Sequence, residues 1–314
     1  MKHALWAAFA MAATIALPTF AAPADQGQGQ AVVTVLPKDS SLTGLAIQPQ
    51  NLELKVDGKS SNVTKLAAAR NPDSPLELVL LIDGGARASL GTQLTDIAGF
   101  IKEIPNNTRI AIAYMENGRA ALAGPLSSDP QQILKGLRLP AGPPGTNASP
   151  YFCLSDLAKN WPSHDNNARR EVLMITDGVD YYNRRYDPED PYVQSAIEDS
   201  VRAGLVVYSF YWLDRGRLDR TEYENNAGQN LLLEVTQATG GNSYWEGSGN
   251  PVSFDPYFHD LRHRFQNQVK VAFSAELKGK PQTTRFSVKL HGIDGKVVAP
   301  QQVFIHPAGS AAGE

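Results

Sequence analysis

Short apolar runs alternate along the middle of the chain with segments whose apolar residues recur every three or four positions. The runs are hydrophobic throughout, which is typical of strands covered on both faces. They span residues 76–83, 109–115, 171–177 and 204–211. Alternation of such strands with helical segments favours βαβ units. We therefore expect an α/β fold, with a Rossmann-like, doubly wound, mainly parallel sheet and helices on both faces.

The two ends of the chain have a different pattern, in which apolar and polar residues alternate. Alternation over 52–56 precedes the turn signal Asp57-Gly58, and alternation over 286–290 precedes Asp294-Gly295. This period of two is typical of antiparallel strands. We expect small β segments at both ends, packed together beside the α/β domain. The expected boundaries are a signal peptide at 1–22, a linker at 23–30, an N-terminal β segment at 31–68, the α/β domain at 74–268, a C-terminal β segment at 269–307 and a disordered tail at 308–314.

The first residues of the chain have the features of a secretory leader. Lys2 is basic, residues 4–17 are largely apolar, and Thr19-Phe20-Ala21 offers small residues for cleavage. No later apolar run is long enough to span a bilayer. The net charge of −3 gives no basic footprint for nucleic acid. We expect an exported protein, periplasmic or secreted, with no nucleic-acid partner and no stable membrane span after cleavage.

Two of the buried strands are predicted to deliver a carboxylate at their C-terminal ends. Asp83 ends the first strand, and Asp177 follows in Thr176-Asp177-Gly178. The carboxyl ends of parallel strands meet at one edge of a sheet, where loops and helix N-termini converge. The two aspartates are therefore expected to lie at a shared edge and to mark a site.

The order of these motifs resembles the von Willebrand factor type A domain, as found in bacterial exported proteins. In that family a DxSxS motif, a threonine from a middle loop and a later aspartate form a metal-ion-dependent adhesion site, which usually holds Mg²⁺. By this resemblance Asp83 matches the first aspartate, Gly85 and Arg87 stand at the two serine positions, Thr146 matches the threonine and Asp177 the later aspartate.

Two of these positions depart from the family pattern. Gly85 has no hydroxyl group, and Arg87 carries a permanent positive charge with no lone pair to donate. We expect a degenerate site in which the Arg87 guanidinium replaces the metal ion, so that no cofactor is required. Two alternatives stay open: Arg87 points to solvent and there is no site, or weak Mg²⁺ binding persists.

The loop after Asp177 is rich in tyrosine and arginine, the residue types most enriched in interface hot spots. We interpret it as a partner-binding loop on the same edge as Asp83; the alternative is an ordinary solvated loop. The mixed-charge loop 214–220 is expected to be solvated. The candidate partner residues are Tyr181, Tyr182, Arg184, Arg185 and Tyr186.

The remaining candidate chemistry is sparse. Neither a GxGxxG nor a GxxxxGK[ST] nucleotide motif is present, and no Gly-x-Ser-x-Gly elbow occurs. His259 and His263 lack the glutamate of an HExxH zinc motif, and Cys153, the only cysteine, is expected to be buried and inert. We expect no enzyme, but an adhesion-like module that binds a protein or envelope component. The alternatives are a hydrolase using Asp83 and Asp177, or a structural scaffold whose site has decayed.

Overall fold

We describe the protein from a computed structural model. It describes residues 25–39, 42, 44–69, 74–86, 88–105, 107–143, 146–183, 185–187, 189–213, 221–247, 249–277 and 279–308. The predicted leader at 1–22, residues 309–314 of the predicted tail and the loop 214–220 lie outside these residues. None of the helices within the described residues has the length and apolar character needed to cross a bilayer.

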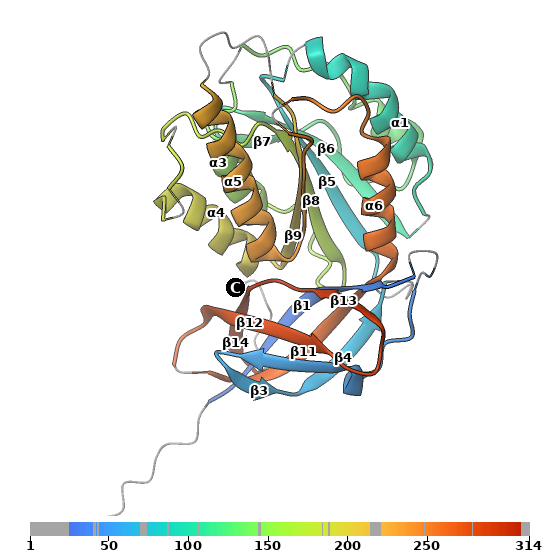
Figure 1. The fold of residues 1–314 in the computed structure, drawn as a ribbon, viewed down its shortest axis with the longest axis vertical. Helices are drawn as coiled ribbons and strands as arrows, with labels where there is room; N and C mark the ends of the chain where they lie inside the picture. Colours follow the sequence, from blue (N-terminus) through green and yellow to red (C-terminus); the bar gives the residue numbers. More distant parts are fainter. Residues whose placement is uncertain are drawn as a thin grey trace, which may run out of the picture.

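The middle of the chain forms a six-stranded mixed sheet with the strand order β10-β9-β8-β5-β6-β7 (Figure 1). The pairs from β10 to β6 are parallel, and β7 joins the edge antiparallel to β6. The apolar runs of the sequence become these strands because both faces are covered. The strands are β5 (Leu76–Asp83), β6 (Thr108–Glu116), β7 (Arg119–Leu122), β8 (Arg169–Thr176), β9 (Leu205–Tyr211) and β10 (Ser243–Tyr244).

Helices cover both faces of this sheet. Side chains of α1 and α6 pack with one set of strand residues, and side chains of α3, α4 and α5 pack with the other. The Asp190 side chain caps α4. Gly240 ends α5 with a positive φ of 82°, which glycine adopts readily because it has no Cβ. The helical elements are η2 (Ala88–Gln93), α1 (Leu94–Lys102), α2 (Pro130–Leu134), α3 (Pro150–Lys159), α4 (Pro191–Arg202), α5 (Glu222–Thr239) and α6 (Asp255–Gln266), together with η1 (Pro49–Asn51).

The two ends of the chain form a second, eight-stranded sheet with the order β3-β2-β12-β14-β1-β11-β4, and β13 pairs with β1. Only Asn62 separates β3 from β4, and the Ser61 hydroxyl donates to Ser274 O on β11. The two ends of the strand order therefore meet, and the sheet curls around its own apolar core. The strands are β1 (Asp25–Pro37), β2 (Leu52–Val56), β3 (Lys59–Ser61), β4 (Val63–Ala68), β11 (Gln268–Leu277), β12 (Gln282–Leu290), β13 (Gly295–Val298) and β14 (Gln302–Pro307).

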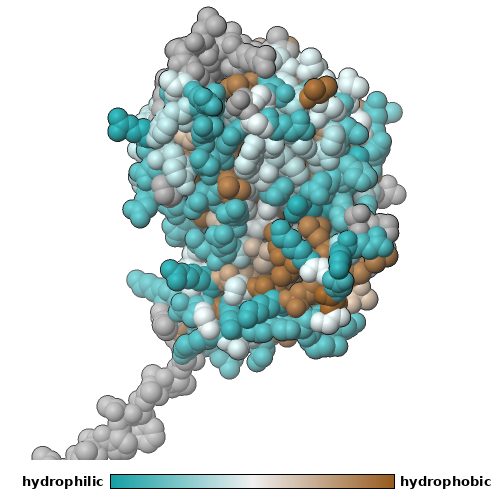
Figure 2. All heavy atoms as spheres, viewed as in Figure 1, coloured by the Kyte–Doolittle hydropathy of each residue, from teal (hydrophilic) through white to brown (hydrophobic). Residues whose placement is uncertain are grey.

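The expected fold class is wrong for this chain. The larger sheet is antiparallel and curled, and the other is mixed, so the molecule is not a mainly parallel, doubly wound sheet with small terminal β segments. The physical reason is long-range pairing: β1 runs antiparallel to β11 along ten residue pairs, from Asp25 and Leu277 to Thr34 and Gln268. Residues 25–30, expected in a linker, therefore belong to a strand. Partly buried hydrophobic side chains pack against the buried core of this sheet, and Figure 2 shows an apolar area on this part of the molecule.

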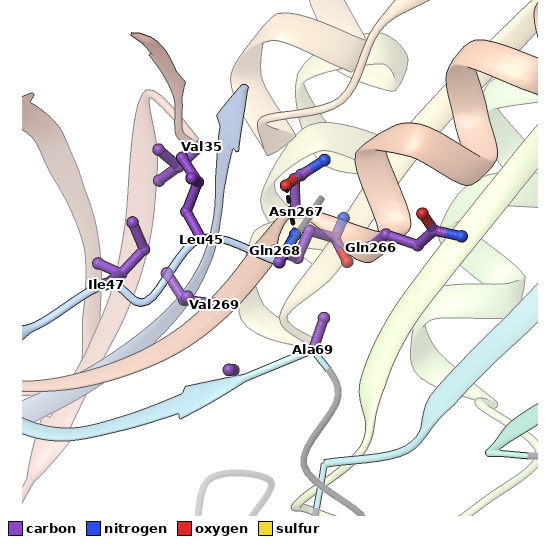
Figure 3. Close-up of a pocket in the computed structure, with 10 residues that line it drawn as sticks. Val35, Leu45, Ile47, Ala69, Gln266, Asn267, Gln268 and Val269 are labelled. Carbon is purple, nitrogen blue, oxygen red and sulfur yellow. Dashed lines mark hydrogen bonds between the residues drawn. The ribbon is translucent and has the colours of Figure 1, made fainter. Parts of the chain in front are cut away.

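A buried arginine joins the two sheets. The Arg169 guanidinium, on the first residue of β8, donates to Phe265 O, to the Gln268 side chain and to Ala69 O. These three acceptors lie near the end of α6, at the start of β11 and directly after β4. Beside this junction, a cavity of about 40 Å³ lies between β1, the segment before η1 and β11 (Figure 3). That volume is too small for an organic ligand.

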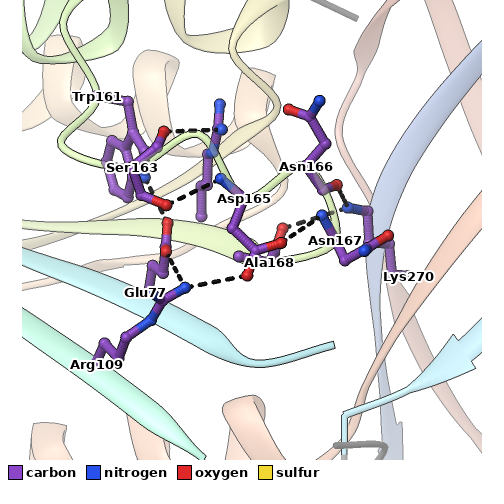
Figure 4. A network of polar contacts seen from close by, with 10 residues as sticks. Glu77, Arg109, Trp161, Ser163, Asp165, Asn166, Asn167, Ala168 and Lys270 are labelled. Carbon is purple, nitrogen blue, oxygen red and sulfur yellow. Dashed lines mark hydrogen bonds and ion pairs between the residues drawn. The ribbon is translucent and has the colours of Figure 1, made fainter. Parts of the chain in front are cut away.

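A polar network supports the same end of the mixed sheet (Figure 4). Glu77 accepts hydrogen bonds from Arg109 at 2.5 Å and from the Trp161 indole at 2.7 Å, and Arg109 also reaches Asp165 at 3.1 Å. Lys270 of β11 donates to carbonyl groups of the loop that leads into β8. Burial and the nearby charge of Arg170 lower the pKa of Lys270 to about 8. Buried charges need such partners, and here the partners connect the sheets.

Candidate functional site

The Asp83 carboxylate is the centre of the predicted edge. It is only 1% exposed, yet both oxygens have donors. Oδ1 accepts the Gly85 N–H at 2.8 Å, while Oδ2 accepts the Asn147 side-chain amide at 2.9 Å and the Thr176 hydroxyl at 3.0 Å. A buried carboxylate remains ionised only where such hydrogen bonds or charges compensate for lost water. Asp83 therefore links the ends of β5 and β8 to the loop before α3.

That loop is held by the turn between β6 and β7. Asn117 and Gly118 have positive φ values of 51° and 74°, as a two-residue hairpin of the Asn-Gly type requires. Their backbone N–H groups donate to Thr146 O at 2.6 Å and Asn147 O at 3.0 Å. The loop continues into Ser149, whose hydroxyl accepts the N–H of Tyr151 and caps α3. The Asn147 side chain is thereby fixed between the hairpin turn and α3.

Asp177 follows directly after β8 and is also 1% exposed. Its Oδ1 accepts the Val179 N–H at 3.0 Å. The next residue, Gly178, has its carbonyl bound by the Tyr151 hydroxyl at 2.7 Å. α5 approaches this backbone so closely that a Cβ on Gly228 would lie 2.2 Å from Asp177 O. The segment after β8 is therefore tightly confined between α3 and α5.

The donor set at this edge does not fit a divalent cation. Mg²⁺ and Ca²⁺ require oxygen ligands, but Gly85 has no side chain that could supply one. The Asn147 amide directs hydrogen atoms, not an oxygen, at Asp83. Among the described residues no group of three or more His, Cys, Asp and Glu side chains could hold a metal ion. The absence of a resident metal thus remains a prediction, and the donor chemistry favours it.

Three aromatic rings cluster beside this buried edge. Phe152 of α3 lies 4.8 Å from Tyr192 of α4 and 5.3 Å from Tyr182 of the loop after β8, measured between ring centroids. The two tyrosine rings are 6.4 Å apart. Tyr182 is 67% exposed and Tyr192 is 45% exposed. We call Phe152, Tyr182 and Tyr192 the aromatic cluster; it places apolar surface in contact with solvent.

Two buried aspartates hold the loop that carries Tyr182. Asp180 Oδ1 accepts the Tyr182 N–H at 2.8 Å, and burial raises the pKa of Asp180. Asp190 accepts the backbone N–H groups of Tyr192 and Val193 through Oδ1 and the Asn183 side chain through Oδ2. Hydrogen bonds to these two aspartates therefore hold the segments that carry Tyr182 and Tyr192 in place.

The structure brings together some of the predicted site residues. Asp83 and Asp177 lie at the ends of neighbouring strands, but both are buried and neither presents a carboxylate to a partner. Thr146 lies against Gly84. Arg87 and Arg184 lie outside the described residues, so the proposed replacement of the metal ion by Arg87 stays a prediction. Of the remaining loop residues, Tyr181 is half-buried, whereas Arg185 and Tyr186 are exposed.

Sequence reasoning missed Asn147, Thr176, Phe152 and Tyr192. For two of these residues the sequence held a hint: Asn147 directly follows the predicted site residue Thr146, and Thr176 directly precedes the predicted site residue Asp177. Cys153, by contrast, is buried as expected, and burial together with the charge of Asp83 raises the pKa of its thiol.

An open hollow of about 580 Å³ lies next to the hairpin turn. It is lined by β7 and α3, and its polar lining includes Glu116, Arg119 and Asp156. The backbone of Gly118 lies close to Phe152: a Cβ added to this glycine would be 3.4 Å from Phe152 Cβ. Asn117 and Arg119, the neighbours of Gly118, line the hollow, so the hollow lies near Phe152 of the aromatic cluster.

Comparison with known proteins gives likeness of fold only. No family model matches the chain, and no curated protein matches it. The similar solved structures include an aerotolerance-related membrane protein from Bacteroides fragilis, with 14% identity, 60% of this chain and 98% of that chain covered, and a TM-score of 0.41. BatB from Bacteroides thetaiotaomicron has 15% identity, coverage of 59% and 95%, and a TM-score of 0.42.

The ArnB paralog VWA2 from Sulfolobus acidocaldarius has 11% identity, coverage of 90% and 76%, and a TM-score of 0.40. At these identities and scores, no residue's role is transferred to this chain. The SpRpn10 VWA domain is also among the similar solved structures, with 9% identity, coverage of 60% and 94%, and a TM-score of 0.40.

Proposed function

We propose that this protein is a non-catalytic, exported interaction module that binds a protein or envelope component through the aromatic cluster. The observation that carries the proposal is the exposure of Tyr182 and Tyr192 next to Phe152, on three different segments of the chain. Tyrosine side chains supply large contact areas at low entropic cost and are enriched among interface hot spots. Arg185 and Tyr186 of the same loop are exposed and would extend the contact.

The buried state of the two aspartates favours binding over catalysis. A general acid or base must come within hydrogen-bond reach of its substrate. Asp83 instead uses both carboxylate oxygens for bonds within the protein, and Asp177 is equally buried. The hydrolase alternative has no comparable support in the arrangement of these groups. Export is supported by the leader-like first residues of the sequence.

The test is chemical cross-linking in envelope fractions of cells that produce the protein. The double variant Tyr182→Ala/Tyr192→Ala is compared with wild type and with Tyr223→Ala, a matched control whose ring on α5 is 57% exposed but lies outside the aromatic cluster. Truncation of a hot-spot aromatic costs about 2 kcal/mol or more, roughly 30-fold in affinity. Circular dichroism checks that each variant is folded.

We expect one cross-linked product of defined mass in wild type and in the Tyr223→Ala control, and its loss in the double variant. Equal yields of that product in all three proteins would contradict the proposal. So would hydrolase turnover by the purified protein that disappears in Asp83→Asn, since this result would favour catalysis.

A further inference from the structure

We propose that Asp83, Asn147 and Thr176 form a cation-independent lock that positions the aromatic cluster. The inference rests on the proposed function, because it explains how the binding surface is held. In an adhesion site with a metal ion, the cation connects segments at the edge of the sheet. In this chain a buried carboxylate with protein donors connects them. The three residues are positioning residues, and none of them touches the partner.

The orientation of the Asn147 side chain is fixed by chemistry. Its Nδ2 lies 2.9 Å from Asp83 Oδ2, and exchanging the amide oxygen and nitrogen would place two oxygens against each other with no hydrogen between them. Asn147 is completely buried, and its own Oδ1 has no hydrogen-bond partner among the residues that the structure describes. The Asp83 carboxylate therefore faces the N–H donors of Asn147. A metal ion bound there would instead need an oxygen ligand from Asn147.

Hydrogen bonds connect Asn147 to the start of α3, where Phe152 lies. The Asn147 carbonyl accepts the Ser149 N–H at 2.7 Å, and Ser149 caps α3 through the Tyr151 N–H. Phe152 is the next residue of the same helical turn. A shift of Asn147 away from Asp83 would therefore move the start of α3 and, with it, one ring of the aromatic cluster.

Thr176 transmits the position to Tyr182 along the segment after β8. Its hydroxyl donates to Asp83 at 3.0 Å and also accepts the Gly178 N–H at 3.3 Å. The Gly178 carbonyl accepts the Tyr151 hydroxyl at 2.7 Å, which ties this segment to α3. Asp180 then fixes the Tyr182 N–H. The carboxylate of Asp83 is thus the common anchor of two paths that end at two rings of the same cluster.

The test is hydrogen exchange of wild type, Thr176→Val and Thr176→Ser, with and without millimolar Mg²⁺ or a chelator. Valine keeps the shape of threonine but removes the donor, and serine restores it. Thr239→Val is the matched control, since Thr239 is also fully buried but its hydroxyl bonds within α5 and to Val207. The same four proteins enter the cross-linking assay.

We expect the Phe152 and Tyr182 amides to exchange at least about tenfold faster in Thr176→Val, because a hydrogen bond to a buried charge is lost. Thr176→Ser and the Thr239→Val control should leave the relative protection of these amides unchanged. Mg²⁺ and the chelator should have no effect on wild type. Protection of the amides by Mg²⁺ would overturn the lock, and so would unchanged exchange in Thr176→Val.

The two proposals fail in different ways. If Thr176→Val leaves exchange unchanged while the Tyr182→Ala/Tyr192→Ala variant still loses the cross-linked product, the lock is wrong and the binding surface stands. If Thr176→Val makes the amides exchange faster but the yield of the cross-linked product is the same in the Tyr182→Ala/Tyr192→Ala variant, the lock stands and its role in binding is refuted.

Discussion

Glu171 makes the stability of the protein depend on pH. It is on β8, completely buried, and its carboxylate lies 3.8 Å from the Arg169 guanidinium that joins the two sheets. Tyr208 of β9 and Gln268 of β11 face the same junction and are hydrogen-bonded to each other. Burial raises the pKa of Glu171 from 4.5 to about 7, although Arg169 acts in the opposite direction. At neutral pH the native state therefore holds this proton more tightly than the unfolded chain.

The sign and size of the effect follow from linkage. Below about pH 4.5 the carboxyl group is protonated in both states, so Glu171 does not favour either one. As the pH rises to about 7 the unfolded chain loses the proton first, and the free energy of unfolding falls. One pKa unit corresponds to about 1.4 kcal/mol, so this group removes about 3 kcal/mol in total.

The assay is urea unfolding at several pH values between about 4.5 and 8 for wild type and Glu171→Gln. Glutamine keeps the shape and cannot ionise, so the variant should gain about 3 kcal/mol relative to wild type across this interval. Glu222→Gln, on the exposed start of α5, is the control and should follow wild type. A constant difference between wild type and Glu171→Gln at every pH would show that Glu171 does not cause the pH dependence.

Three further predictions concern packing and reactivity. Gly241→Ala should not accumulate as folded protein, because its Cβ would lie 1.8 Å from Val207 O; a wild-type yield and melting temperature would contradict this. Trp161→Phe should lower the free energy of unfolding by about 1.5–3 kcal/mol, since it removes a donor to the buried Glu77; denaturant unfolding that shows no loss would speak against it. Cys153 should resist iodoacetamide in the native state and react after unfolding, because burial raises the pKa of its thiol; rapid native labelling, followed by mass spectrometry, would show that the thiol is accessible.

The local pattern predicted the elements of the mixed sheet well. The apolar runs at 76–83 and 204–211 became β5 and β9. Such elements depend on neighbouring residues, so their pattern is visible in the sequence. The size of the antiparallel sheet was not predicted. Alternation of apolar and polar residues over 286–290 is the same whether the strand belongs to a small hairpin or to a large curled sheet. Its partners are set by pairing between distant parts of the chain.

The site was predicted only in part for a related reason. The positions of Asp83 and Asp177 follow from strand ends, which the sequence marks. The role of Asn147 depends on which carboxylate its amide meets after folding, and no spacing rule specifies that contact. Tyr192 lies in the first turn of α4, and its contact with Phe152 arises only when α3 and α4 pack together. Side-chain clusters of this kind are properties of tertiary structure.

Site-specific photo-cross-linking in intact cell envelopes tests directly whether the aromatic cluster binds a partner. A photoreactive phenylalanine is placed at Tyr182, at Tyr192 or at the control position Tyr223. We predict that the first two positions give an adduct with the same envelope component and that the third gives none. Adducts from position 223 alone, or no adduct from either cluster position in folded, exported protein, would contradict the claim that the aromatic cluster is the binding surface.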